Sequence, residues 1–290
     1  MTARLRLAGY KTAIQQKMAE MKISVIIPSY NQGHFIEKTI LSVLDQSYKK
    51  VELIIIDGGS TDNTADILQK YDPGISYWRS EKDKGQSHAF NKGLEIASGD
   101  YIGWINSDDV YYPGTFEAVI ENLSSDPQTD VLFGDYDYID ETDNLIHRKK
   151  EIQFNPSEAY WTGKCNHANL AGFFKRKCFE KAGPLDESLH YAMDYDLYLR
   201  FGLMNCRFVQ IRRPLGAYRI HSGSKTKQSR DKMLAEVSLV QKKYQTSFPC
   251  KLPEEFYCLY YRSSGIIKKT IGGCYSLKSI SGIRHLYAKI

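Results

Sequence analysis

Apolar runs and helically spaced apolar positions alternate along the first part of the chain. Residues 23–27 and 51–56 are almost all apolar, and most of them are β-branched. Such runs predict strands that are buried on both faces, as in a parallel sheet. Between them, apolar residues recur at helical spacing over residues 35–44. A strand, a helix and a second strand in this order indicate a right-handed parallel crossover. We therefore expect an α/β fold with a Rossmann-like, mostly parallel central sheet flanked by helices.

The rest of the chain also shows apolar runs and helically spaced apolar positions. Residues 136–151 are polar and weakly periodic, which indicates a hairpin region. Further strands are predicted at 75–78, 101–105, 131–133, 170–174 and 214–221, and further helices at 88–97, 116–123, 178–183, from 191 onward and at 233–244.

Composition and charge divide the chain into three parts. The 290 residues are 42% hydrophobic and 25% charged, which is typical of a globular protein. The net charge is +5, but residues 225–290 alone carry thirteen Lys and Arg against four Asp and Glu. We expect an N-terminal extension at 1–21, a main domain at 22–224 and a basic, aromatic-rich helical tail at 225–290.

Several classes of protein lose support from what the chain lacks. It contains neither GxGxxG nor GxxxxGK[ST], which argues against dinucleotide redox and P-loop chemistry. The six cysteines show no CxxC pair and no zinc-ligand spacing, so we expect a reduced, cytoplasmic setting. No apolar run approaches the roughly 20 residues of a membrane-spanning helix. We expect no nucleic-acid partner, and the oligomeric state is left open.

The strand predicted at 101–105 ends in Asn106, Ser107, Asp108 and Asp109. In an open α/β sheet, ligands bind beyond the carboxyl ends of the strands. Two adjacent carboxylates repel each other and need a cation, hydrogen bonds or full solvation. Mg²⁺ or Mn²⁺ would suit them and often carries a diphosphate. The alternative is an ordinary solvated Ser-Asp-Asp turn.

Four other positions are candidate ligands or catalytic groups, and for three of them a structural role is the alternative. Tyr30 follows the first strand, and Asp57 ends the second in a Gly-rich turn that it could simply stabilise. Asp194 lies at the start of a predicted helix, where a carboxylate is stabilised as a general base or as an N-cap. His221 could bind metal or phosphate, or be an ordinary surface or core residue.

These motifs together resemble the family 2 glycosyltransferases of GT-A fold. The resemblance covers roughly residues 22–224 and rests on motifs that occur in the family's order, which is more specific than any one of them. The motifs are Pro28-Ser29-Tyr30-Asn31, Ser42-Val43-Leu44-Asp45-Gln46-Ser47-Tyr48, Asp57-Gly58-Gly59-Ser60-Thr61-Asp62, Asn106-Ser107-Asp108-Asp109 and Met193-Asp194-Tyr195-Asp196.

The resemblance implies inverting transfer of a sugar, of hexosyl or N-acetylhexosaminyl type, from a nucleotide diphosphate sugar. A UDP-sugar is the first expectation for the donor, and a glycan or lipid-linked hydroxyl for the acceptor. Asp194 would be the catalytic base. Mn²⁺ or Mg²⁺ would be held by Asp108, Asp109 and His221, and the donor by Pro28, Ser29, Tyr30, Asp57, Gly85, Asn106 and Asp108.

Three positions depart from the family's pattern. Gly58 stands where many relatives carry a second Asp, Asn106 replaces the first Asp of the metal motif, and Met193 replaces a Glu. An amide ligates a metal more weakly than a carboxylate does, so the departure at Asn106 bears on metal affinity.

Two other functions remain open beside the transferase. One is a degenerate transferase fold that serves as a nucleotide-sugar sensor or an assembly scaffold. The other is a nucleotidyltransferase, although the loop after the first strand lacks the Gly-rich, basic character that a triphosphate requires. The aromatic and basic residues of the tail would suit peripheral contact with the inner face of a membrane, or packing on the core.

Overall fold

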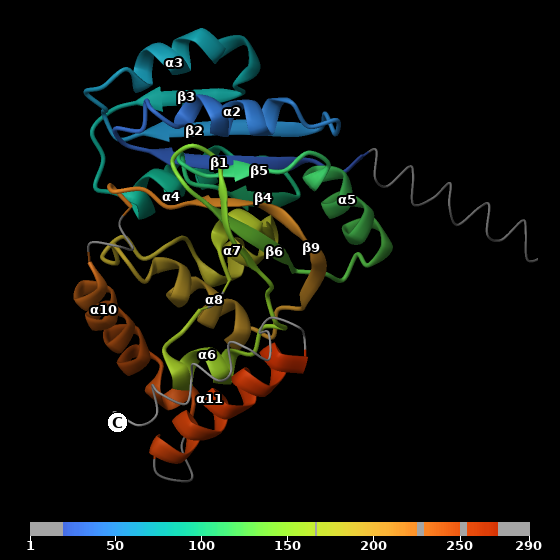
Figure 1. Ribbon diagram of the computed structural model, residues 1–290, viewed down its shortest axis with the longest axis vertical. Coiled ribbons are helices and arrows are strands. Elements are labelled where there is room, and N and C mark those ends of the chain that lie inside the picture. Colours follow the sequence, from blue (N-terminus) through green and yellow to red (C-terminus); the bar gives the residue numbers. More distant parts are fainter. Residues whose placement is uncertain (1–19, 166, 225–228, 250–253, 272–290) are drawn as a thin grey trace, which may run out of the picture.

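The computed structural model describes residues 20–165, 167–224, 229–249 and 254–271. In these ranges the chain forms a nine-stranded sheet with helices on both faces, which confirms the predicted α/β class (Figure 1). The strand order is β3-β2-β1-β4-β8-β6-β9-β5, and β7 extends from β6 as a hairpin. Of the predicted N-terminal extension, residues 1–19 lie outside the described ranges.

The first half of the sheet is parallel, as the apolar runs predict. Its strands are β1 (Ile23–Ser29), β2 (Val51–Asp57), β3 (Tyr77–Ser80) and β4 (Tyr101–Trp104). They are connected by α2 (Ile36–Leu44), α3 (Thr64–Tyr71) and α4 (Gln86–Ile96). Parallel strands end at one edge, so the polar loops after β1, β2 and β4 lie on the same side of the sheet.

The second half of the sheet is mixed. β8 (Gly172–Lys175) runs antiparallel between β4 and β6 (Val131–Ile139), and β7 (Leu145–Lys149) is antiparallel to β6. β6 is parallel to β9 (Phe208–Arg219), which pairs antiparallel with the two-residue strand β5 (Val110–Tyr111). This half brings the end of β9 beside the turn that follows β4.

The helices cover the sheet in two layers. Ile27 and its neighbours on one face pack under α2, α3 and α5 (Thr115–Ser125). Ile26 on the other face packs under α4, α6 (Pro156–Thr162), α7 (Arg176–Ala182) and α8 (Met193–Leu203). The alternation of adjacent β1 residues between the two layers explains why the strand is apolar without interruption.

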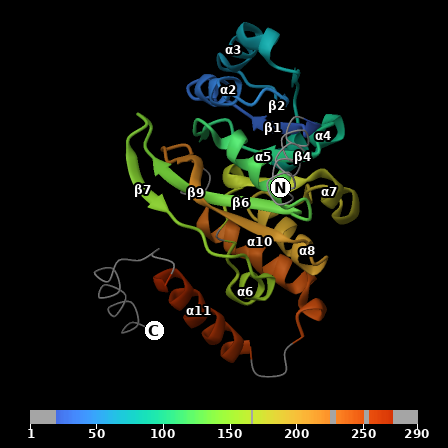
Figure 2. The same cartoon turned by 90° about the vertical axis from the view of Figure 1, so that its right-hand side faces the viewer.

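Two helices of the predicted tail pack against this second layer. They are α10 (Arg230–Lys243) and α11 (Glu254–Ile271), which lie beside α8 and α6 (Figures 1 and 2). Tyr257 of α11 stacks on Trp161 of α6 with ring centroids 4.9 Å apart. Within the described residues, no helix combines the length and the apolarity that crossing a bilayer requires. The boundary at residue 224 remains a prediction.

The structure differs from the sequence prediction at several element ends, each for a local reason. Pro28 does not end β1, because β4 has already ended where the missing N–H of Pro28 would face it. β3 begins at Tyr77 rather than residue 75, since a 3-10 turn (Asp72–Gly74) precedes it. The helix α6 was not predicted, although the Asn155 side chain caps it by accepting from the Glu158 N–H.

At the amino ends of the parallel strands, the Glu52 carboxylate joins several segments. It accepts hydrogen bonds from Ser24 Oγ at 2.5 Å, from the Ser98 N–H at 2.8 Å and from Lys22 Nζ at 2.9 Å. Burial opposes its ionisation, but these donors outweigh burial and lower the pKa of Glu52 to about 2. Glu52 therefore ties β1, β2 and the segment before β4 together as a carboxylate.

We predict that Glu52→Gln lowers the free energy of unfolding by about 2–3 kcal/mol at pH 7. Because the folded pKa lies below the unfolded value, the carboxylate's contribution is present above about pH 4.5 and fades toward pH 2. Urea unfolding at pH 7, 4 and 3 should show the gap to wild type shrinking. Glu95→Gln, at an exposed position of α4, is the control; a gap that is absent or constant with pH contradicts the prediction.

Candidate functional site

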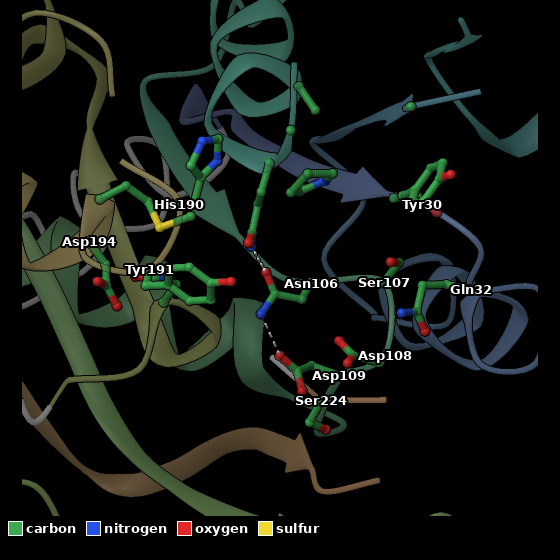
Figure 3. A pocket seen from close by; sticks show the side chains of 18 of the residues that line it. Tyr30, Gln32, Asn106, Ser107, Asp108, Asp109, His190, Tyr191, Asp194 and Ser224 are labelled. Carbon is green, nitrogen blue, oxygen red and sulfur yellow. Dashed lines mark hydrogen bonds between the residues drawn. The ribbon is translucent and has the colours of Figure 1, made fainter. Parts of the chain in front are cut away.

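A cavity of about 740 Å³ lies beyond the carboxyl ends of β1 and β4. In Figure 3, Asn106 lies between Tyr30 and Gln32 on one side and Tyr191 and Asp194 on the other. The cavity brings together most of the residues predicted as site residues: Pro28, Ser29, Tyr30, Gly85, Asn106, Asp108, Asp109 and Asp194.

The end of β1 offers two polar side chains to the cavity. Ser29 is buried, and its Oγ has no hydrogen-bond partner within the described residues. A buried hydroxyl without a partner is costly, so a ligand in the cavity would satisfy it. Tyr30 leaves the strand with its side chain 59% exposed, which is unusual for a large aromatic residue and suits ring stacking with a ligand.

Asp57 occupies a different position from the other predicted site residues. It is fully buried and is not among the residues that line the cavity. Its carboxylate accepts bonds from the Ser60 N–H at 2.8 Å, Ser60 Oγ at 2.5 Å and Ser80 Oγ at 2.6 Å. This is the turn-stabilising geometry that the sequence left open, and its contact with a base or ribose remains a prediction.

The two adjacent carboxylates after β4 have different surroundings. Asp109 is buried and accepts from the Arg219 N–H at 2.9 Å and from Asn106 Nδ2 at 3.3 Å. Burial first, and then the charge of Asp108, raise the pKa of Asp109 well above its ordinary value. Asp108 is partly exposed at the cavity, and its Oδ2 lies 2.9 Å from Nε2 of His221. Asp108 and His221, two of the three predicted metal ligands, are therefore in contact although 113 residues separate them in the sequence.

Arg219 supports this turn, although the sequence analysis did not single it out. Its side chain is fully buried, and its Nε donates to the Asp108 carbonyl at 2.8 Å. Its Nη1 lies 2.6 Å from Asp143 Oδ1 and donates to the Asp140 carbonyl at 3.0 Å. In the sequence, Arg219 is marked only by its place near the end of a predicted strand, two positions before His221.

Gln86 was also missed, and it fixes the amide that replaces the first Asp of the metal motif. Gln86 Nε2 donates to Asn106 Oδ1 at 2.6 Å, and Asn106 donates onward to Asp109 (Figure 3). The chain of bonds aims the Asn106 oxygen at Gln86. Gly85, just before, adopts φ +114°, which only glycine tolerates readily, and starts α4 at the cavity wall.

Asp194 lies in the first turn of α8 and reaches the cavity. The N-cap position belongs to Ala192, which makes no side-chain cap, so Asp194 is not an N-cap. Burial raises the pKa of Asp194 to about 6, although the Tyr195 N–H at 2.7 Å works against this and the charge of Glu236 adds to it. A carboxyl tuned to this range can both accept and release a proton near neutral pH.

The donor set at the acidic turn fits a divalent cation that is shared with a ligand. Within the described ranges, no three or more His, Cys, Asp or Glu side chains gather as a complete cage. Mg²⁺ and Mn²⁺ are commonly held by one or two carboxylates together with phosphate oxygens, so a partial set is sufficient. Asp108 and His221 form such a set, and Asp109 is turned toward Arg219 and Asn106.

Solved structures share this fold. TarS from S. aureus, in complex with UDP-GlcNAc, aligns with a TM-score of 0.64 over 82% of this chain and 69% of its own, at 18% identity. The mannosyltransferase PcManGT from Pyrobaculum calidifontis, in complex with GDP-Man and Mn²⁺, aligns with a TM-score of 0.60 over 97% of this chain and 89% of its own, at 16% identity. The architecture is therefore that of the GT-A glycosyltransferases.

Curated relatives match at higher identity. An uncharacterized glycosyltransferase of Rickettsia typhi is 33% identical over 190 residues, which are 62% of this chain and 58% of the relative. One of Mycobacterium tuberculosis is 33% identical over 192 residues, 66% of this chain and 72% of the relative. The chain thus spans about three fifths of the Rickettsia relative. The model of the family described as "Glycosyl transferase family 2" matches residues 24–193, and the chain belongs to this family.

Proposed function

We propose that the chain is a metal-dependent, inverting glycosyltransferase that moves a hexosyl or N-acetylhexosaminyl group from a nucleotide diphosphate sugar to an acceptor hydroxyl. One observation carries the proposal. A single cavity is lined by Asp108, which pairs with His221, and by Asp194, whose pKa is raised to about 6. A cation-binding carboxylate and a proton acceptor in one cavity are the two groups that such a transfer requires.

The donor would lie between the end of β1 and the acidic turn. Ser29 offers there a hydroxyl that has no partner in the described part of the chain, and Tyr30 offers an exposed ring. The neighbours in fold are described with UDP-GlcNAc, with UDP and with GDP-Man, which supports a nucleotide-sugar donor. We propose a UDP-sugar first, with the diphosphate at Asp108.

A divalent cation, Mn²⁺ or Mg²⁺, would be held by Asp108 and His221. When bound, it would neutralise the negative charge that develops on the leaving nucleoside diphosphate. Arg219 keeps the Asp108 backbone in place, and Asp109 takes up the buried contacts of the turn. Asp108 is thereby left with its carboxylate toward the cavity.

Asp194 would accept the proton of the acceptor hydroxyl. As that proton moves to the Asp194 carboxylate, the acceptor oxygen bonds to the anomeric carbon from one face. The bond from this carbon to the diphosphate oxygen breaks on the opposite face, and the nucleoside diphosphate leaves with the electron pair. A single displacement of this kind inverts the anomeric configuration.

We further propose a lipid-linked acceptor, reached from the cytoplasmic face of a membrane through α11. Phe256, Leu259 and Tyr260 share one face of this helix and are each more than 60% exposed. Arg262 follows three residues after Leu259, and residues 225–290 carry the excess of basic charge. Exposed aromatic and aliphatic residues beside cations suit an anionic lipid surface.

For the metal, we predict that Asp108→Ala abolishes the Mn²⁺ dependence of nucleotide binding, because it removes the carboxylate that faces the cavity. Calorimetric titration with UDP and GDP, each with and without Mn²⁺, measures this. Asp83→Asn is the matched control, since it neutralises another carboxylate lining the same cavity and should keep the metal response. An unchanged metal response in Asp108→Ala would place the cation elsewhere.

For the base, we predict that Asp194→Asn reduces transfer or donor hydrolysis by at least about 10²-fold while nucleotide affinity stays within about twofold. Because the base must be ionised, wild-type kcat/KM should fall tenfold per pH unit below about pH 6.

The same replacement should not lower stability. A folded pKa above the unfolded value means that the ionised Asp194 opposes folding above about pH 6, so Asp194→Asn should melt no lower than wild type at pH 7.5. Asp196→Asn, which breaks a buried ion pair two residues later, should melt lower. Full turnover in Asp194→Asn would refute the base. Tight nucleotide-sugar binding by wild type with no turnover toward water or any acceptor would favour the sensor or scaffold.

For the membrane contact, we predict that the triple variant Phe256→Ser, Leu259→Ser, Tyr260→Ser loses at least about 10-fold of its partitioning onto vesicles containing anionic lipid. Cosedimentation with anionic and with zwitterionic vesicles measures this. The double variant Leu145→Ser, Ile146→Ser removes exposed apolar side chains from β7 and should bind like wild type. Equal binding by wild type and the triple variant would exclude α11 as the contact.

A further inference from the structure

The helix α10 lies outside the part of the chain that the family model matches, yet it reaches the cavity. Met233, in its first turns, lines the cavity, as does Ser229 just before the helix. Val237 and Val240 of the same helix are buried in the core with α6 and α8. Because these two side chains are packed in the core, α10 is a rigid support for the segments that its other side chains contact.

Glu236 projects from α10 onto the loop that leads into α8. One of its carboxylate oxygens accepts from the Tyr191 N–H at 2.7 Å and from the Ala192 N–H at 2.9 Å. The His190 N–H lies 3.0 Å from both oxygens. Three successive backbone donors are thus held by one side chain, about 45 residues further along the chain.

Glu236 supplies the N-terminal capping of α8 that the residues directly before the helix do not supply. Ala192 occupies the N-cap and cannot cap the helix with its side chain. The carboxylate of Glu236 supplies negative charge near the positive end of α8 and forms charge-assisted bonds, which are shorter and stronger than neutral ones. The loop is therefore fixed in the path that leads directly to Met193 and Asp194.

A second set of contacts fastens α10 to α8 independently. Asp196, fully buried, accepts from Lys243 Nζ at 3.0 Å and from the Tyr244 hydroxyl at 2.9 Å. Arg200 of α8 completes the pairing through Nε at 2.7 Å. The first turn of α8 is therefore held from α10 on both sides of Asp194, through residues 190–192 and through Asp196.

We propose that Glu236 is a positioning residue for Asp194, and that α10 belongs to the catalytic unit. Glu236 itself is not among the residues that line the cavity, so it acts through the loop rather than on a substrate. The loop residues His190 and Tyr191 do line the cavity, so the same three bonds also set part of its wall. The inference rests on the proposed function in one respect, the role of Asp194 as the base.

The test compares Glu236→Ala and Glu236→Gln with wild type. Glu236→Ala should lower kcat about 10- to 100-fold, because a displacement of about 1 Å at a reacting group costs rates of this order. KM for the donor should stay within about twofold, since none of the three bonds involves a residue proposed to bind the donor. Glu236→Gln should lose less, because its amide oxygen can still accept from Tyr191 and Ala192.

Asp231→Asn is the matched control, since it removes an exposed carboxylate from the same helix and should leave kcat unchanged. Backbone amide exchange at residues 190–192 should become faster in both Glu236 variants and not in the control. The double variant Glu236→Ala, Asp194→Asn should be no slower than Asp194→Asn alone, because a residue that acts through Asp194 has no effect once the base is gone.

The outcomes separate this inference from the proposed function. A wild-type protein that neither binds nor turns over a nucleotide sugar sinks the proposed function. If the wild type is active and the Glu236 variants keep full kcat, or lose kcat and donor affinity together, the positioning role is contradicted and the proposed function is not. If Glu236→Ala does not fold, the comparison of Glu236→Gln with wild type decides. Additive losses in the double variant would also contradict the positioning role.

Discussion

The buried guanidinium of Arg219 is the constraint on which the acidic end of the cavity depends. An uncompensated charge in the interior would be very unfavourable, so its surroundings must supply acceptors. Its Nε and Nη1 find them in two segments: the Asp108 carbonyl in the turn after β4, and the Asp140 carbonyl and Asp143 carboxylate in the β6–β7 loop, with the Phe35 ring 5.1 Å away. The turn after β4, the end of β9 and the β6–β7 loop are thereby joined at one group.

That junction explains how two neighbouring carboxylates come to differ. The backbone N–H of Arg219 binds Asp109, which draws this side chain inward, where its pKa rises. Asp108, attached to the same turn, then points to the open side and meets His221 two residues beyond Arg219. Asp109 supports the turn, and the Asp108 carboxylate remains at the cavity. The sequence suggested that the two carboxylates repel each other. In the structure this repulsion is relieved because Asp109 is buried among hydrogen-bond donors while Asp108 faces the cavity.

The sequence predicted the parallel half of the fold well because burial on both faces leaves a visible apolar run, as in β1 and β2. It predicted the mixed half less well because short elements such as β5 have no period to detect. Within the site, the ends of β1 and β4 were found since parallel strands end together. Gln86, Arg219 and Glu236 were not, because each acts on a partner far away in sequence and is an ordinary polar residue in its own segment.

The tail shows why composition alone could not decide between membrane contact and packing. Tyr257 and Tyr261 are one helical turn apart on the face of α11 that packs against the core, and Tyr257 stacks on Trp161. Phe256 and Tyr260 have the same spacing, one residue earlier, and face outward. Packing on the core therefore accounts for the inward-facing row, whereas membrane contact through the outward-facing row remains a proposal. Because the inward row anchors α11 to α6, which packs on α8, the outward row is presented on the same body that holds Asp194.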